Sequence, residues 1–155
     1  TQNIHGINTY YLNEKIIDNQ MTVLLEHKPK LKLEKIVNFE DGFYSLENNN
    51  KEKWIWGTKT GKINIKAFIN QKVKLNIKLR VASKRNITFK IGTKVETIEF
   101  LDNNIKTISF IVNLKKGNNL LEVSSDSNAI KLSKADNRMF SHCIYDIIIK
   151  DNNVR

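Results

Sequence analysis

Apolar and polar residues alternate along most of the chain after residue 62. The alternation runs through six stretches, which are KINIKAF (62–68), VKLNIKLRVA (73–82), NITFKIG (86–92), VETIEFL (95–101), IKTISFIVNL (105–114) and NLLEVS (119–124). A period of two places successive side chains on opposite faces of a β-strand. Each stretch therefore predicts a strand with one buried face and one face in water.

Turn residues separate these stretches, roughly every eight to twelve residues, a spacing typical of β-sandwiches. The turn signals are Gly61, Asn70, Gly92, LDNN (101–104) and KKGNN (115–119). Further apolar stretches at MTVLL (21–25), LKLEKIV (31–37), KWIW (53–56) and CIYDIIIK (143–150) bring the predicted number of strands to about ten. No helix of ordinary length fits the pattern, although residues 7–18 fit a short turn. We therefore predict an all-β fold, an antiparallel β-sandwich of jelly-roll-like order.

The length of 155 residues fits one domain. We expect an N-terminal tail or short turn over residues 1–20, a single β-sandwich domain over residues 21–150, and a frayed C-terminus over residues 151–155. Pro29, the only proline, is expected in a turn between two early strands. The longest apolar run is a few residues, far below the roughly 20 that cross a bilayer, so no membrane span is predicted.

Positive charge exceeds negative charge, with 26 Lys and Arg against 16 Asp and Glu and a formal net charge of +10. Four basic residues, Lys72, Lys74, Lys78 and Arg80, fall on one face of a predicted strand, and we call them the basic stripe. The stripe is either a solvated sheet face or a surface for an anionic polymer, whose binding would weaken steeply with salt. It contains no aromatic residue, so nucleic acid is disfavoured as a partner.

The sequence contains no constellation typical of catalysis. His5, His27 and His142 do not belong to an HExxH or HxH motif, and no GxSxG, GxGxxG or P-loop motif occurs. Cys143 is the only cysteine, which excludes an intrachain disulfide and a cysteine metal cluster. His142 and Cys143 are strand neighbours that point to opposite faces, which argues against a Cys–His dyad. We therefore predict no catalytic residue, no metal site and no cofactor.

Aromatic residues gather in one short region. Phe43, Tyr44, Trp54 and Trp56 lie within fourteen positions of one another, in a chain with thirteen Phe, Tyr and Trp residues. In KWIWG the two indoles share one face of a strand and Ile55 points to the other. Either Ile55 is buried and the indoles are outside, or the indoles are buried and Ile55 faces water or a second layer. The cluster is thus a hydrophobic core or a platform for a sugar ring, and the pattern leaves both interpretations open.

The same region carries a resemblance to a known family. GFYSLE, a short polar loop, KWIWG, NNLLEVSSD (118–126) and ADNRMFSHCIYDIIIK (135–150) follow one another over residues 39–150. This order resembles the G-[FW]-[YH]-x-x-E … RW and Asp-x-Arg pattern of β-sandwich domains attached to bacterial cell-envelope glycosyltransferases and related membrane sugar-transfer proteins. Ile55 stands where that pattern has Arg, and MFS (139–141) replaces its usual ELG.

The resemblance implies a jelly-roll-like sandwich similar to carbohydrate-binding modules. It implies that Asp136 and Arg138 form a structural corner near Glu47, and that Trp56 packs inside. We expect Trp56 to be buried beside Ile63 and Ile148. The ligand-binding residues expected nearer the surface are Tyr44, Asn49, Lys53 and Trp54.

The function expected from this resemblance is that of a non-catalytic glycan-binding or accessory domain in a bacterial cell-envelope polysaccharide or glycosylation system. The domain itself is expected not to be an enzyme, and the sequence leaves open whether its parent protein is a glycosyltransferase. The expected partners are a polysaccharide or an anionic cell-envelope polymer, and another domain or subunit of a membrane protein. The location is then extracytoplasmic or cell-envelope associated. The alternative is a structural or protein–protein interaction domain with no glycan ligand.

Overall fold

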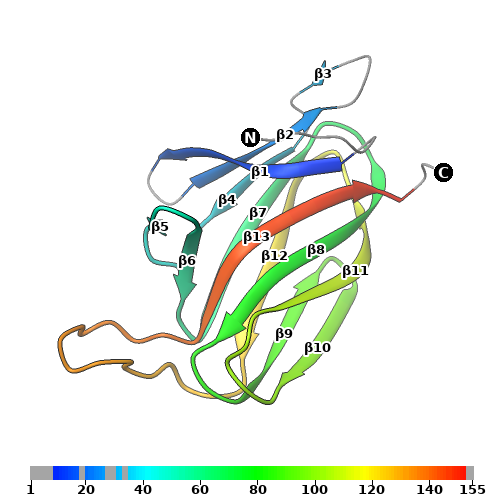
Figure 1. Cartoon of the computed structure of the whole chain (residues 1–155). Coiled ribbons are helices and arrows are strands. Elements are labelled where there is room, and N and C mark those ends of the chain that lie inside the picture. The colour runs from blue at the N-terminus through cyan, green and yellow to red at the C-terminus, as the bar shows by residue number, and fades with distance from the viewer. Residues whose placement is uncertain (1–8, 18–19, 27–30, 33–34, 153–155) are drawn as a thin grey trace.

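The computed structural model describes residues 9–17, 20–26, 31–32 and 35–152. These residues form thirteen strands and no helix (Figure 1). The strands are β1 (Thr9–Ile17), β2 (Gln20–Glu26), β3 (Leu31–Lys32), β4 (Lys35–Phe39), β5 (Glu47–Asn48), β6 (Lys53–Gly57), β7 (Thr60–Ala67), β8 (Gln71–Val81), β9 (Arg85–Ile91), β10 (Lys94–Phe100), β11 (Lys106–Leu114), β12 (Gly117–Ser125) and β13 (His142–Asp151). No helix long and apolar enough to cross a membrane is found in the described ranges.

The strands form two facing antiparallel sheets. The first sheet has the order β10-β9-β12-β7-β4-β2. In the second sheet β11 pairs with β8 and β8 pairs with β13, while β6 and β1 pair with opposite ends of β13. β1 also pairs with β2 and so joins the two sheets along one side (Figure 1). The predicted antiparallel, jelly-roll-like β-sandwich is confirmed.

The space between the sheets is filled by the alternate apolar positions that the sequence pattern predicts. On β8, the inward residues Val73, Leu75, Ile77, Leu79 and Val81 are fully buried. Ile63 and Ile65 on β7 and Phe89 on β9 belong to the same core. Burying one such aliphatic side chain contributes roughly 1.5–3 kcal/mol, so the core makes each sheet a rigid support for the side chains on its outer face.

The two ends of the chain differ from the expectation. Residues 1–20 were expected to be a tail or short turn, but residues 9–17 form β1 between β2 and β13. A β-bulge between Asn13 and Ile16 shifts the register within β1, and this interrupts the alternation that would mark a strand. At the other end, Asp151 belongs to β13 and the backbone N–H of Asn152 donates to the Lys72 carbonyl at 3.1 Å. The turn expected at Pro29, and the residues His5 and His27, lie outside the described residues.

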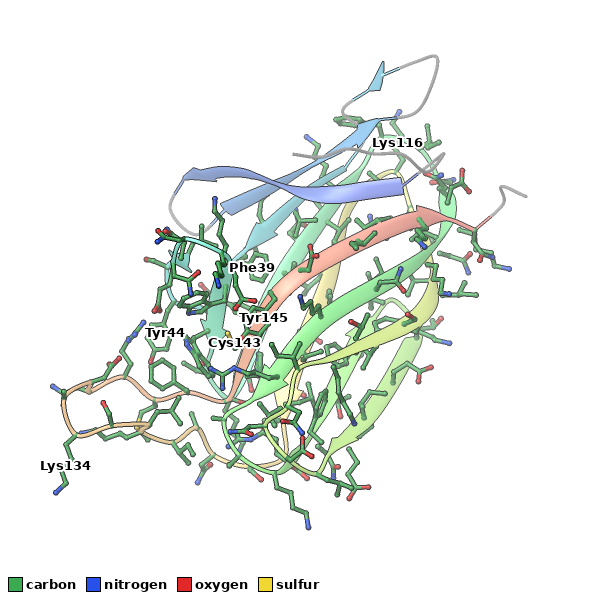
Figure 2. All side chains as sticks on the ribbon, viewed as in Figure 1. Phe39, Tyr44, Lys116, Lys134, Cys143 and Tyr145 are labelled. Atoms are coloured by element: carbon green, nitrogen blue, oxygen red, sulfur yellow. The ribbon has the colours of Figure 1, made fainter. Side chains whose placement is uncertain are left out.

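One long excursion separates the last two strands. Residues 126–141 leave the sandwich after β12 and return to the start of β13, with Lys134 at the far tip (Figures 1 and 2). Ile130 and Phe140 hold the two arms together through reciprocal backbone hydrogen bonds of 2.8 and 2.7 Å. We call residues 126–141 as a whole the 126–141 segment. Its returning arm packs Phe140 against β6, on the face that points away from the core.

Gly42 marks a close crossing of two backbones. Its φ is +89°, and a Cβ there would overlap the carbonyl oxygen of Thr60 and lie 2.6 Å from Cα of Gly61. Its carbonyl accepts the backbone N–H of Thr58 at 2.8 Å, which fixes the chain just before the aromatic stretch.

We expect Gly42→Ala to lower the free energy of unfolding by about 3 kcal/mol, from the left-handed backbone and the overlap together. Gly92→Ala is the matched control, because its φ is also positive, at +59°, but nothing lies within 4 Å of the added Cβ. It should lose only about 1–2 kcal/mol. Urea unfolding of both variants measures the difference. Equal losses would show that the crossing at Gly42 is looser than described.

Candidate functional site

The outer face of the second sheet brings together side chains from three neighbouring strands. Trp54 and Trp56 come from β6, Tyr145 from β13, and Lys78 and Arg80 from β8. We call these five residues the aromatic–cationic face. Cys143 of β13 lies opposite both Trp56 and Arg80 in the strand register, so the pairing of the three strands creates the cluster. Figure 2 labels Tyr145 and Cys143 along β13, and Tyr44 toward the 126–141 segment.

A β-bulge sets the position of Tyr145. Ile144 pairs with Leu79 and Asp146 with Lys78, so Tyr145 is the extra residue on β13 with no partner on β8. A bulge re-aims side chains locally. Here Tyr145 reaches the outer face beside Trp54, with 6.5 Å between ring centroids and a tilt of 54°. The hydroxyl of Tyr145 accepts a 2.7 Å hydrogen bond from Nε of Arg80, and Nζ of Lys78 lies 6.0 Å from the ring centroid.

Trp56 is the buried member of the face, with 5% of its surface exposed. The centroids of its indole and of the Phe140 ring are 4.6 Å apart, and Cζ of Arg80 lies 4.9 Å from the centroid of the indole. Ile55 on the opposite side of β6 is also fully buried, in the core between the sheets. KWIWG is therefore buried on both sides at these positions: the 126–141 segment covers Trp56, and Ile55 faces the opposite sheet, as in the alternative in which Ile55 faces a second layer.

The expected neighbours of Trp56 also need correction. Trp56 is buried as expected, but it packs with Phe140 and Cys143 in a separate cluster and not beside Ile63 and Ile148. Ile63 belongs to the core on the inner side of the sheet. For Ile63 the difference follows from strand alternation, since Trp56 points outward while Ile63 points inward. Ile148 lies farther along β13, opposite Asn76, whereas Trp56 lies opposite Cys143.

Trp54 and Tyr145 form the accessible end of the face. Both side chains are partly exposed and pack against the Trp56 cluster. Burial raises the pKa of Tyr145, so its phenol stays neutral and serves as hydrogen-bond acceptor for Arg80. Arg80 is consequently held by one hydrogen bond and one ring contact, which orders its guanidinium on the surface.

Tyr44 closes the other side of the cluster. Its hydroxyl donates to the Met139 carbonyl at 3.1 Å and accepts the Met139 N–H at 3.2 Å. The Arg138 guanidinium lies over two rings, with its Cζ 5.3 Å from the ring centroid of Tyr44 and 4.8 Å from that of Phe140. Tyr44, expected to contact ligand, is thus engaged in holding the 126–141 segment against the sheet.

The three residues of the expected corner contact one another. Arg138 Nη1 donates to Glu47 at 2.6 Å, and its Nη2 and Nε donate to Asp136 at 2.8 and 3.1 Å. The hydrogen bonds from Arg138 lower the pKa of Asp136 to about 2, so this carboxylate stays charged at neutral pH. The corner ties the 126–141 segment to β5 and thereby to the strand that carries Trp54.

Asn49 and Lys53 do not converge on Trp54. The side-chain oxygen of Asn49 accepts the backbone N–H groups of Lys51 and Glu52, both at 2.8 Å, so it stabilises the turn between β5 and β6. Lys53 precedes Trp54 on β6 and points to the opposite side of the strand. Of the expected ligand residues, Asn49 stabilises a turn, Tyr44 holds the 126–141 segment against the sheet, and Lys53 points away from Trp54. Trp54 is the one that presents a partly exposed ring on the face.

The basic stripe continues from the aromatic–cationic face along β8. Lys78 and Arg80 are partly buried among the aromatic rings, whereas Lys74 and Lys72 are exposed. The stripe was described from the sequence as free of aromatic residues, but its Arg80 end contacts Trp56 and Tyr145. Tyr145 was missed by the sequence analysis, and its only signal was a ring within the apolar strand CIYDIIIK.

The remaining reactive residues are buried and uncharged. Burial raises the pKa of the Cys143 thiol to about 12, which leaves no thiolate for nucleophilic attack. His142 points inward, where its Nδ1 lies 3.0 Å from the Ser141 hydroxyl and its ring meets Phe43 edge-on. His142 and Cys143 therefore face opposite sides of β13. Among the residues that the structure describes, no group of three or more His, Cys, Asp or Glu side chains could hold a metal ion.

The fold is similar to solved carbohydrate-binding modules. The CBM22-1 xylan-binding domain of Paenibacillus barcinonensis Xyn10C matches with a TM-score of 0.51 at 8% identity, over 77% of this chain and 87% of that chain. A family 35 carbohydrate-binding module from an environmental isolate matches with a TM-score of 0.48 at 17% identity, over 75% of this chain and 93% of that chain.

A longer protein also contains a similar domain. The Podospora anserina GH26-CBM35 β-(1,4)-mannanase matches at 13% identity with a TM-score of 0.49, over 79% of this chain and 28% of the enzyme. This chain therefore spans little more than a quarter of that enzyme. No protein-family model matches the sequence, and no curated protein matches it. The chain is a β-sandwich of the architecture found in carbohydrate-binding modules.

Proposed function

We propose that this chain is a non-catalytic glycan-binding domain. The observation that carries the proposal is the partly exposed pair Trp54 and Tyr145, which lies on a rigid sheet beside the ordered guanidinium of Arg80. The apolar face of a pyranose packs on an aromatic ring, while cationic and amide donors bind its hydroxyl groups. The uncharged, buried Cys143 and His142 fit a binding role better than a catalytic one.

The biological setting is part of the proposal. The pattern of residues 39–150 resembles domains of bacterial cell-envelope glycosyltransferases, and the contacts among Glu47, Asp136 and Arg138 agree with what that resemblance implies. We therefore propose a polysaccharide or glycosylation system of the cell envelope, an extracytoplasmic location, and a parent protein that contains or contacts a membrane glycosyltransferase.

A structural or protein-contact role is the second candidate. It is favoured by the exposed apolar side chains of Leu132 and Met139, which are 45% and 42% exposed on the protruding 126–141 segment. In that role the aromatic–cationic face would serve to anchor the segment and would bind no sugar.

A glycan array followed by titration calorimetry tests the first candidate. We expect the wild type to bind at least one polysaccharide, and Trp54→Ala to weaken that binding at least about tenfold, equivalent to about 1.4 kcal/mol. The reason is that alanine removes the stacking surface beside Tyr145 while leaving Trp56 in place.

Phe68→Ala is the matched control. Phe68 is 40% exposed and has Nζ of Lys66 at 5.9 Å from its ring centroid, so it also pairs an exposed ring with a cation, but away from the aromatic–cationic face. Its removal should leave glycan binding unchanged. A wild type that binds no glycan on a broad array would favour the structural role instead.

A further inference from the structure

We propose that the ligand is an acidic, linear polysaccharide, which binds along the outer face of β8 and β13 with one sugar ring on Trp54 and Tyr145 and its negative charges on the lysines beyond them. This inference rests on the proposed glycan-binding function. It adds the chemical class of the ligand and the path that the ligand follows.

The lysines form a continuous row that begins at the aromatic rings. Lys78, Lys74 and Lys72 all point outward from β8, and Lys78 contacts the ring of Tyr145. Successive outward positions on a strand are about 6.8 Å apart. The row from Arg80 to Lys72 is then roughly 27 Å long, which suits an extended polymer better than a single sugar.

A second strand adds charge to the same row. Lys150 of β13 lies directly opposite Lys74 of β8 in the strand register. Like charges at directly opposed positions on a sheet destabilise it. Such a pair is favourable when an anion lies between the two ammonium groups.

The described side chains supply little compensating negative charge on this face. In the described part of the chain, no carboxylate forms an ion pair with Lys72, Lys74 or Lys150. The neighbouring strand β11 presents Thr107, Ser109, Ile111 and Asn113 as its outward row, and none of them is acidic. An acidic neighbour of these described rows is Asp146, which lies opposite Lys78 in the strand register. Burial raises the pKa of Asp146, and the charge of Lys78 offsets part of this increase.

Polar groups between the charges suit a sugar backbone. Asn76 lies between Lys74 and Lys78 on β8, and its side-chain oxygen accepts a hydrogen bond from the Ser109 hydroxyl. These amide and hydroxyl groups offer donors and acceptors to sugar hydroxyls along the row. Among the residues whose side chains the structure describes, the aromatic rings of this face lie at the Arg80 end, whereas proteins that bind single-stranded nucleic acid stack successive bases on rings along the strand. The face therefore favours an acidic glycan over a nucleic acid.

The experiment compares polysaccharides that differ only in charge. Calorimetry or biolayer interferometry at low and at high salt would use polygalacturonate, alginate and hyaluronan beside their methyl-esterified or carboxyl-reduced forms. We expect the wild type to bind at least one acidic form at least tenfold more tightly than its neutral form. The affinity should increase with oligosaccharide length and fall with salt.

Two double variants with the same change of net charge distinguish binding at the proposed site from attraction by the overall positive charge of the protein. Lys74→Gln with Lys150→Gln should weaken binding to the acidic form at least tenfold and reduce its dependence on salt. Lys66→Gln with Lys90→Gln changes two exposed lysines on the outer face of the first sheet, and binding should change less than twofold. Melting temperatures of both variants show whether the fold is kept.

Each contrary result has a distinct meaning. If neutral and acidic forms bind equally and only Trp54→Ala weakens them, the glycan-binding function stands and the acidic-ligand inference is overturned. Equal losses in the two double variants, or tighter binding of poly(dT) through Lys74 and Lys150, also overturn it. If no acidic or neutral glycan binds, the inference and the proposed function both fail.

Discussion

Replacing Trp56 with alanine is expected to lower the free energy of unfolding by about 3 to 5 kcal/mol, the usual loss for a large buried aromatic side chain. The indole fills the space between Phe140 and Arg80 and is only 5% exposed. Alanine leaves a cavity below Phe140 and removes the ring on which the guanidinium lies. The melting temperature should fall by roughly 10 °C for a domain of this size.

Two comparisons make the test specific for Trp56. Trp54→Ala should lose much less stability, since its side chain is partly exposed. Trp56→Phe keeps a ring against Phe140 and should lose less than Trp56→Ala. Urea unfolding gives all three values. Equal losses for Trp54→Ala and Trp56→Ala would mean that both indoles contribute to the core alone, and would weaken the case for a binding surface.

Acid is expected to destabilise the protein from about pH 6.5 downward, because His142 remains neutral in the folded state. Burial, followed by the nearby charge of Arg85, lowers the pKa of His142 to about 3. The unfolded chain binds a proton at His142 below about pH 6.5, while the folded chain binds none until about pH 3. Stability is therefore lost as the pH falls through this window, by at most about 1.4 kcal/mol per pH unit.

His142→Gln isolates this contribution. Glutamine keeps a polar group near the Ser141 hydroxyl but does not titrate, so the variant should depend less on pH between 6.5 and 3 than the wild type. Urea unfolding at several values from pH 7.5 to 4 measures both proteins, and the carboxylates that titrate in this range are common to the two. A constant difference in unfolding free energy across the series would show that His142 is protonated normally in the folded protein.

The class of fold could be predicted because a strand with one buried face shows alternating apolar and polar residues in its own sequence. The alternation in β7 to β12 depends only on neighbouring positions, so it is visible in the sequence of each strand. β1 was missed because its bulge between Asn13 and Ile16 interrupts that alternation. A single bulge changes which residues point inward, without changing the strand's place in the sheet.

The composition of the site depends on contacts between distant strands. Lys78 and Arg80 meet Trp54 and Tyr145 only because β13 lies between β6 and β8, and no local pattern reports that order. The position of Trp56 depended on the 126–141 segment, whose sequence has the composition of a loop. Arg138 was the one long-range partner that the sequence supplied, and it came from the resemblance to a family.

The place of β13 in the second sheet also affects how the chain reaches its folded state. β13 follows the other twelve described strands in sequence, yet it is the strand to which β8, β6 and β1 all pair. Thr9 pairs with Lys150, so this sheet closes only when residues about 140 positions apart meet. Pairing over such separations is slow, because the loop must close before its contacts form. During synthesis, an edge of β8 remains unpaired until β13 emerges, and chaperone protection is most needed in that interval.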